Sequence, residues 1–260
     1  MSLLTKRSST GDIVKGGIIG FMIVGVLAVA AHLYTNYGYS KSARFNNLTF
    51  YYSDEVQENY VKTIQSKMSE YILIAEKVIG EKIAFDRIRI NLKNNKMAQK
   101  DTVLSKGVYG YYSNNIIVLR SERYVIEGPR GDAVFYSPPD PVKTFYHEYT
   151  HYLTKDSGLP RWFSEGLAEY LAYKTLGQKD RKVLSTIKFN LIVDEKNWET
   201  QDKNLLYGAS EAYINKIITQ WGEESIQRII TESPGTTDFT MVLERAIGIP
   251  YLEIVNVLSK

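Results

Sequence analysis

The sequence HEYTH at positions 147–151 places two histidines and a glutamate at a spacing that suits metal-dependent hydrolysis. In an α-helix four residues advance the chain by about 400°, so the side chains of His147 and His151 differ in direction by only ~40° and lie one turn apart. Both imidazoles can then reach a single Zn²⁺ ion. Glu148 lies about 100° further round the helix than His147, so it can face the same cleft without binding the metal.

A carboxylate in the position of Glu148 can accept a proton from a water that the ion activates and later return that proton to a leaving amine. The pattern therefore predicts Glu148 as a general base. The flanking residues predict a helix that begins near residues 141–143, because an apolar stripe lies on roughly the opposite side from the histidines. That stripe contains Val142, Phe145, Tyr149, Tyr152 and Leu153.

A third metal ligand is predicted downstream, in the segment LPRWFSEGLAEY at positions 159–170. Pro160 suits the start of a second helix, on which Glu165 and Glu169 share one face. Glu165 completes a His₂Glu ligand set and leaves one position open for water. We expect Glu169, one turn further on, to hold the free ring nitrogen of a metal-binding histidine. We also expect Gly166 to let this helix approach the HEYTH helix closely.

The two segments together resemble the peptidase MA-like gluzincins, which combine an HExxH helix with a downstream Trp-x-x-Glu-Gly-x-Ala-Glu-Tyr helix. The strong resemblance covers residues 141–174, and a weaker one extends to YGAS at 207–210. It implies a zinc peptidase of zincin-like fold. The metal ligands that it implies are His147, His151 and Glu165, and the general base is Glu148.

The resemblance also bears on two further positions. Thermolysin-like gluzincins have Asp where this chain has Glu169, whose side chain is one methylene longer. Many gluzincins stabilise the oxyanion with a Tyr or His from a later helix, in addition to the metal. Tyr207 is the candidate for that role here and Tyr213 is its rival, while either tyrosine could instead be structural.

The amino-acid composition limits which side chains can hold a metal. The chain has no cysteine, which excludes disulfides, thiolate zinc sites and thiol nucleophiles, so a metal must be held by histidine and carboxylate. Of its three histidines, His32 receives no role. Beyond residue 15 the chain carries 29 basic and 28 acidic residues. That near-neutral balance lacks the basic surface that nucleic-acid binding needs, so no nucleic-acid partner is expected.

The N-terminal region contains an uncharged apolar run of nineteen residues at 16–34. At about 1.5 Å per residue, a helix of that length matches a bilayer core of roughly 30 Å. We therefore expect residues 1–15 to be a cytoplasmic tail, 16–34 a single transmembrane anchor and 35–47 a linker. The alternative is a signal peptide cleaved near Ala30. Under both readings, the remainder of the chain lies outside the cytoplasm.

Residues 48–260 are predicted to form one α+β domain. Strand patterns cover residues 48–52 and 85–92, a helical pattern covers 54–79, and a hairpin is expected at 107–120 with its turn at 113–115. A Gly/Pro-rich stretch, 128–141, precedes a half that is helical nearly throughout. The segment 116–119 is either an edge strand to which an extended peptide adds or a core strand.

Taken together, these features predict a membrane-anchored zinc metallopeptidase that hydrolyses the peptide bonds of a peptide or protein. Two alternatives remain open. One is a metal-binding surface or regulatory module without hydrolytic activity, against which the presence of Glu148 argues, since a purely structural metal site needs no general base. The other is a zinc hydrolase of a non-peptide amide.

Overall fold

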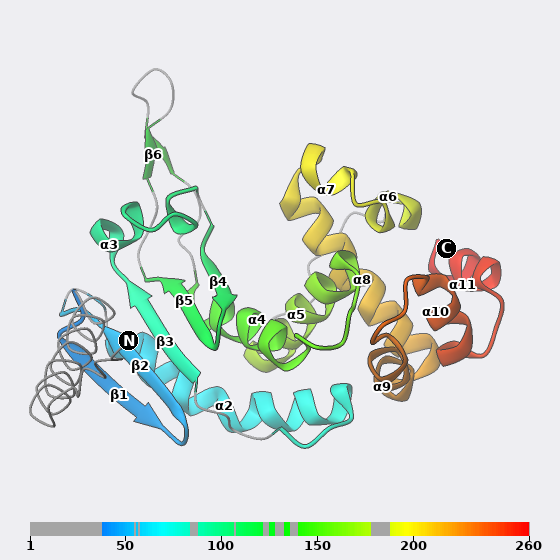
Figure 1. The fold of residues 1–260 in the computed structure, drawn as a ribbon, viewed down its shortest axis with the longest axis horizontal. Helices are drawn as coiled ribbons and strands as arrows, with labels where there is room; N and C mark the ends of the chain where they lie inside the picture. The colour runs from blue at the N-terminus through cyan, green and yellow to red at the C-terminus, as the bar shows by residue number, and fades with distance from the viewer. Residues whose placement is uncertain are drawn as a thin grey trace, which may run out of the picture.

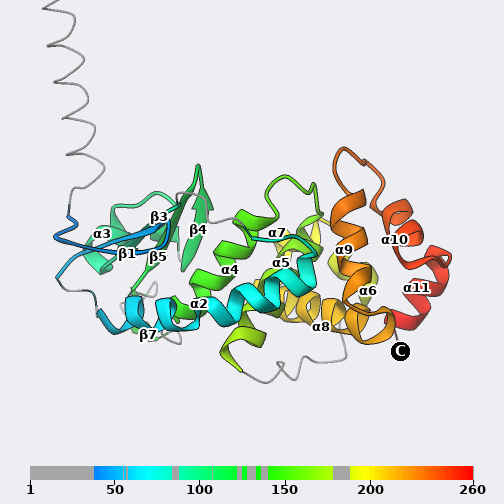
Figure 2. The same ribbon diagram turned by 90° about the horizontal axis from the view of Figure 1, so that it is seen from below.

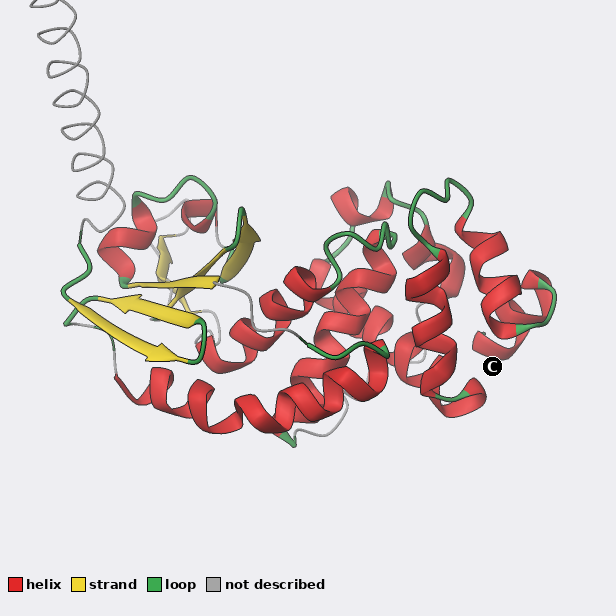
Figure 3. Ribbon diagram, turned by 60° about the horizontal axis from the view of Figure 1, so that its bottom comes forward, coloured by secondary structure: helices red, strands yellow, loops and turns green. Residues whose placement is uncertain are grey.

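The computed structural model describes residues 38–54, 56, 58–83, 88–106, 108–121, 125–127, 133–135, 140–177 and 188–259. The strands come first along the chain and gather at one end of the molecule, whereas the second half is helical (Figures 1 and 3). The α+β prediction is therefore confirmed. The predicted tail and transmembrane anchor, residues 1–34, lie outside the described residues. None of the helices in the described ranges is long and apolar enough to cross a bilayer.

Five strands form one mixed sheet in the order β1-β2-β3-β5-β4. Strands β2, β3 and β5 run parallel, and β1 and β4 pair antiparallel at the two edges. The strands are β1 Lys41–Phe45, β2 Leu48–Tyr52, β3 Ile88–Lys93, β4 Gly110–Ser113 and β5 Ile116–Arg120.

The sheet differs from the sequence predictions at both edges. Strand β1 falls within the stretch 35–47 that was predicted to be a linker, so the folded domain begins before residue 48. The predicted hairpin is present, and Asn114 and Asn115 adopt the positive φ angles of 49° and 60° that its tight turn requires. The edge-strand hypothesis for 116–119 is wrong, because β5 lies between β3 and β4.

Side chains alternate between the two faces of the sheet, and the faces differ in character. One face packs against α2 (Glu58–Ile79) and α4 (Pro141–Leu153) in the main hydrophobic core. Its fully buried members are Leu48, Phe50, Ile90, Leu92, Ile117 and Leu119. The other face is more polar and is partly covered by α3 (Asn95–Gln99) and a 3₁₀ turn, Leu104–Lys106.

The helical half is built around α5 (Arg161–Leu176), which packs against both α4 and α8 (Lys203–Trp221) (Figure 2). Helix α2 crosses the same body and contacts α4, α5 and α9. The other helices are α6 Phe189–Val193, α7 Asn197–Thr200, α9 Glu223–Glu232, α10 Phe239–Ile247 and α11 Tyr251–Leu258. A separate two-stranded ribbon, β6 Val125–Glu127 with β7 Ala133–Phe135, lies in and beside the Gly/Pro-rich stretch.

Gly166 fixes the distance between α5 and α8. A Cβ atom at this position would lie 2.6 Å from the backbone oxygen of Ser210, which is closer than side-chain carbons approach a backbone oxygen. The expectation that Gly166 faces the HEYTH helix is therefore wrong. It faces α8 on another side of α5, which leaves the side of α5 that carries Glu165 and Glu169 toward α4.

We expect Gly166→Ala to lower the free energy of unfolding by about 1–3 kcal/mol, because the added methyl group must push α8 away from α5. The control is Leu73→Ala on α2, where the parent side chain is 69% exposed and the expected change is within about 0.5 kcal/mol. Thermal unfolding followed by circular dichroism measures both. A Gly166→Ala protein as stable as the parent would contradict the close contact.

Candidate metal centre

Helix α4 carries the HEYTH residues, and its ends and its buried face explain its position. Asp140 caps the helix by accepting hydrogen bonds from the backbone N–H groups of the first turn, and Pro141 occupies the first helical position. On the buried side, the hydroxyl of Tyr146 donates to the carbonyl of Ile64 at 2.7 Å. These contacts fix the rotation of α4 against α2, so that the two histidines project toward α5.

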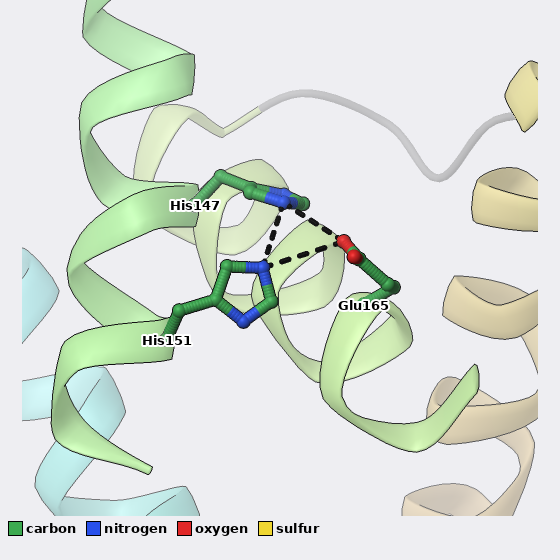
Figure 4. Close-up of side chains that lie close together, drawn as sticks. All are labelled: His147, His151 and Glu165. Atoms are coloured by element: carbon green, nitrogen blue, oxygen red, sulfur yellow. Dashed lines mark hydrogen bonds and ion pairs between the residues drawn. The ribbon is translucent and has the colours of Figure 1, made fainter. Parts of the chain in front are cut away.

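Helix α5 brings Glu165 to the two histidines (Figure 4). The Nε2 atoms of His147 and His151 are 3.1 Å apart. Oε2 of Glu165 lies 3.1 Å from Nε2 of His147 and 3.3 Å from Nε2 of His151. All three side chains are partly exposed, so the cluster is open to solvent on one side.

The three atoms fit a zinc ion. With ligand bonds of about 2.0–2.1 Å, neighbouring ligand atoms around a tetrahedral Zn²⁺ are about 3.3 Å apart, close to the separations found here. Two imidazole nitrogens and one carboxylate oxygen also form the ligand set of open, hydrolytic zinc sites. The described residues thus contain a group that can hold zinc.

The second ring nitrogen of His147 has a carboxylate partner. Nδ1 of His147 lies 3.2 Å from Oε1 of Glu169, and the other oxygen of Glu169 accepts from Nζ of Lys143 at 2.7 Å. Lys143 in turn lies over the ring of Tyr173, with Nζ 4.4 Å from its centroid. The longer side chain of Glu169, compared with Asp, therefore reaches the imidazole and a lysine at the same time.

His151 has a hydroxyl partner instead, because its Nδ1 lies 3.1 Å from Oγ of Ser164. Sequence analysis did not assign a role to Ser164 or Lys143. Ser164 directly precedes Glu165, and Lys143 is one turn before His147, so helical spacing alone could have identified both residues as neighbours of the site. Their actual partners depend on how α4 and α5 cross.

The carboxylates make the site favourable for a cation. Burial alone would lower the pKa of His147, but the adjacent Glu165 and Glu169 raise it to about 10. Burial would raise the pKa of Glu169, whereas His147 and Lys143 lower it to about 2. Burial would also raise the pKa of Glu165, but the imidazoles of His147 and His151 hold it below its usual range. Positive charge at His147 is thus stabilised from two sides.

Glu148 is close to the ligands but has a separate partner. Its side chain is buried, and its carboxylate accepts a hydrogen bond from the backbone N–H of Tyr112 in the edge strand β4. Burial raises the pKa of Glu148, while the two histidines and that hydrogen bond lower it less strongly. The carboxyl group is therefore a better proton acceptor than an exposed glutamate.

The structure distinguishes the two candidate tyrosines. The ring of Tyr207 lies 6.1 Å from the ring of His147, edge to face, and its hydroxyl is hydrogen-bonded to Arg161. Burial raises the pKa of Tyr207, so its hydroxyl stays protonated at neutral pH and can donate. Tyr213 instead packs at 5.0 Å against Phe189 in the core. Tyr207 is thus the tyrosine that borders the metal ligands.

Comparison with known proteins finds a similarity in fold. No protein-family model and no curated protein matches the sequence. The fold is similar to that of Legionella pneumophila aminopeptidase A, solved in complex with aspartic acid, with a TM-score of 0.51 and 13% sequence identity. The match covers 81% of this chain and 26% of that one, so this chain spans about a quarter of that enzyme. The likeness shows a zincin-like fold.

We expect Glu165→Ala to lower zinc content at limiting metal, because it removes the charged member of the ligand set. Glu169→Ala should weaken zinc binding by about 10–100-fold, as loss of a partner of a metal-binding histidine commonly does. Glu253→Ala, a change at an exposed position of α11, is the matched control and should bind zinc as the parent does. Mass-spectrometric metal analysis after equilibration against a zinc buffer measures all three, and parental zinc content in Glu165→Ala would contradict its role as a ligand.

Proposed function

We propose that this chain is a zinc-dependent metallopeptidase. The observation that carries the proposal is the joint placement of His147, His151 and Glu165 around one point, with the buried carboxyl group of Glu148 next to them. The fold likeness to an aminopeptidase supports it. A site that only bound metal would need the three ligands but no adjacent proton acceptor, which favours a hydrolase over a non-hydrolytic module.

Zinc bound at the three ligands would supply Lewis acidity and lower the pKa of a water to about 7. In this proposal Glu148 would act as the general base, accepting a proton from the attacking water and passing it to the leaving amine. Its raised pKa suits both steps, because the carboxyl group can hold the proton between them. Tyr207, kept protonated by burial, would donate a hydrogen bond to the developing oxyanion.

The edge strand β4 is the proposed binding surface for the peptide backbone. It pairs with β5 on one side only, and its Tyr112 N–H contacts Glu148, so its other side borders the site. An extended peptide can add to such an edge through main-chain hydrogen bonds. Peptide addition was first considered for residues 116–119, and we now assign it to the neighbouring strand β4.

We expect Glu148→Gln to keep zinc at parental stoichiometry, because the change leaves the three ligands in place and preserves the size of the side chain. Removal of the proton acceptor should lower turnover by about 10²–10⁴-fold. Cleavage of a broad peptide library and metal analysis on the same preparation test this, with Glu253→Gln as the control. A Glu148→Gln protein that cleaves as fast as the parent, or a zinc-loaded parent that cleaves no peptide, would refute the peptidase proposal.

We also propose that residues 16–34 anchor the protein in a membrane, with the catalytic domain outside the cytoplasm. The support is the uncharged run itself, flanked by Lys15 on one side and a polar stretch on the other. In this proposal the anchor is retained in the mature protein.

We expect the full chain to remain with membranes after carbonate extraction. The double variant Ile23→Lys/Leu27→Lys should move to the soluble fraction, since a lysine at the centre of a spanning helix costs about 2.5–3.5 kcal/mol. Mass spectrometry of the mature N-terminus distinguishes a retained anchor from a cleaved signal peptide. A mature protein that begins near Ala31 would replace the anchor by a cleaved signal peptide.

A further inference from the structure

The polar face of the sheet contains a cavity of about 850 Å³, which lies apart from the metal centre. Arg89, Asn91 and Lys93 of β3 line it, and these residues alternate with the buried Ile88, Ile90 and Leu92, which face the opposite side, toward the core. The proposed metal ligands project from α4 and α5, and α4 lies on the core side of the sheet. The cavity is therefore a separate site.

The walls of the cavity carry an excess of positive charge. Its cationic side chains are Arg89, Lys93, Lys96 and Lys100, and its acidic side chain is Asp54. Asp54 is paired with Lys41 at 3.4 Å, and Lys93 with Asp101 at 2.6 Å. Lys96 and Lys100 are exposed and make no ion pair with any described residue.

Arg89, one of the residues that line the cavity, is held in place by two neighbours. Its guanidinium carbon lies 4.0 Å from the centroid of the Tyr51 ring, and its Nε donates to Oδ1 of Asn91 at 2.8 Å. Asn91 is 9% exposed, so the arginine is oriented by a nearly buried amide. A stacked, oriented guanidinium is the arrangement that proteins use to bind phosphate and carboxylate groups.

Tyr39, which lines the cavity, has a buried hydroxyl group. The hydroxyl of Tyr39 is inaccessible to solvent, and it forms no hydrogen bond with the part of the chain that the structure describes. Burial raises its pKa, which keeps it protonated. A buried hydroxyl normally has a hydrogen-bond partner. A ligand with several acceptor oxygens and negative charge would contact the lysines directly, and a turn of the Tyr39 ring toward the cavity would let its hydroxyl donate to the same ligand.

Some of the residues that line the cavity lie close in sequence to the proposed membrane anchor, which indicates a ligand from the membrane. Gly38, Tyr39 and Ser40 form part of its wall, and the apolar run ends at Tyr34. Four residues span at most about 14 Å. If residues 16–34 cross a bilayer, as proposed above, the cavity lies at the level of the lipid headgroups. We propose that this cavity binds the phosphate group of an anionic phospholipid. This inference rests on the membrane anchor and not on the peptidase activity.

The proposal is tested on the full chain in non-ionic detergent, by native mass spectrometry during titration with phosphatidylglycerol or phosphatidylcholine. We expect the parent to bind the anionic lipid more tightly. Each basic side chain near an anionic surface is worth about five-fold in affinity, so Lys96→Gln/Lys100→Gln should weaken binding of phosphatidylglycerol by about 25-fold. Lys62→Gln/Lys67→Gln, with the same charge change on α2, is the matched control and should bind like the parent.

A second variant tests whether the lipid binds in the cavity, because it leaves the surface charge unchanged. Tyr39→Phe removes only the buried hydroxyl, and loss of a hydrogen bond to a charged group should weaken phosphatidylglycerol binding by about ten-fold. Unchanged binding in Tyr39→Phe, or equal binding of the two lipids by the parent, would refute the proposal. Tight binding of inorganic phosphate by the parent without a preference between lipids would also refute it. Zinc content and thermal unfolding should match the parent in every variant, which excludes misfolding as the cause.

Discussion

The contact between α4 and α5 is the interaction on which the candidate metal centre depends. It buries carboxyl groups, which is costly unless each has a charged or hydrogen-bonding partner. Glu169 is satisfied by His147 and Lys143, and Glu165 by the two histidines. The ion pairs therefore hold the two helices in one register, and the same register sets the distances between the proposed ligands.

The three glutamates of the candidate site have different surroundings, which suit them to the different tasks that we propose. Glu165 and Glu169 face imidazole or ammonium groups, which keep them ionised. Glu148 lies one step round α4, and its burial raises its pKa more than the two histidines and the backbone N–H from β4 lower it. In the proposed function, one carboxyl group of this small cluster binds a metal, one orients a histidine and one transfers a proton.

The two faces of the sheet have separate proposed functions. The apolar face supports α4 and, through it, the candidate metal centre, while the edge strand β4 is the proposed binding surface for the peptide. The polar face carries the basic cavity beside the point where the chain leaves the apolar run. A lipid bound there would orient the domain on the membrane without contact with the catalytic residues.

The sequence alone determined the spacing of His147 and His151, the starts of α4 and α5, and the α+β class. These features follow from helical periodicity and from proline and capping positions, which depend on neighbours in the chain. Only the tertiary structure decided that Gly166 faces α8, that β4 and not β5 is the edge, and that β1 lies in the expected linker. It also selected Lys143 as the partner of Glu169. These features depend on contacts between segments far apart in sequence, for which a single chain without its fold gives no local signal.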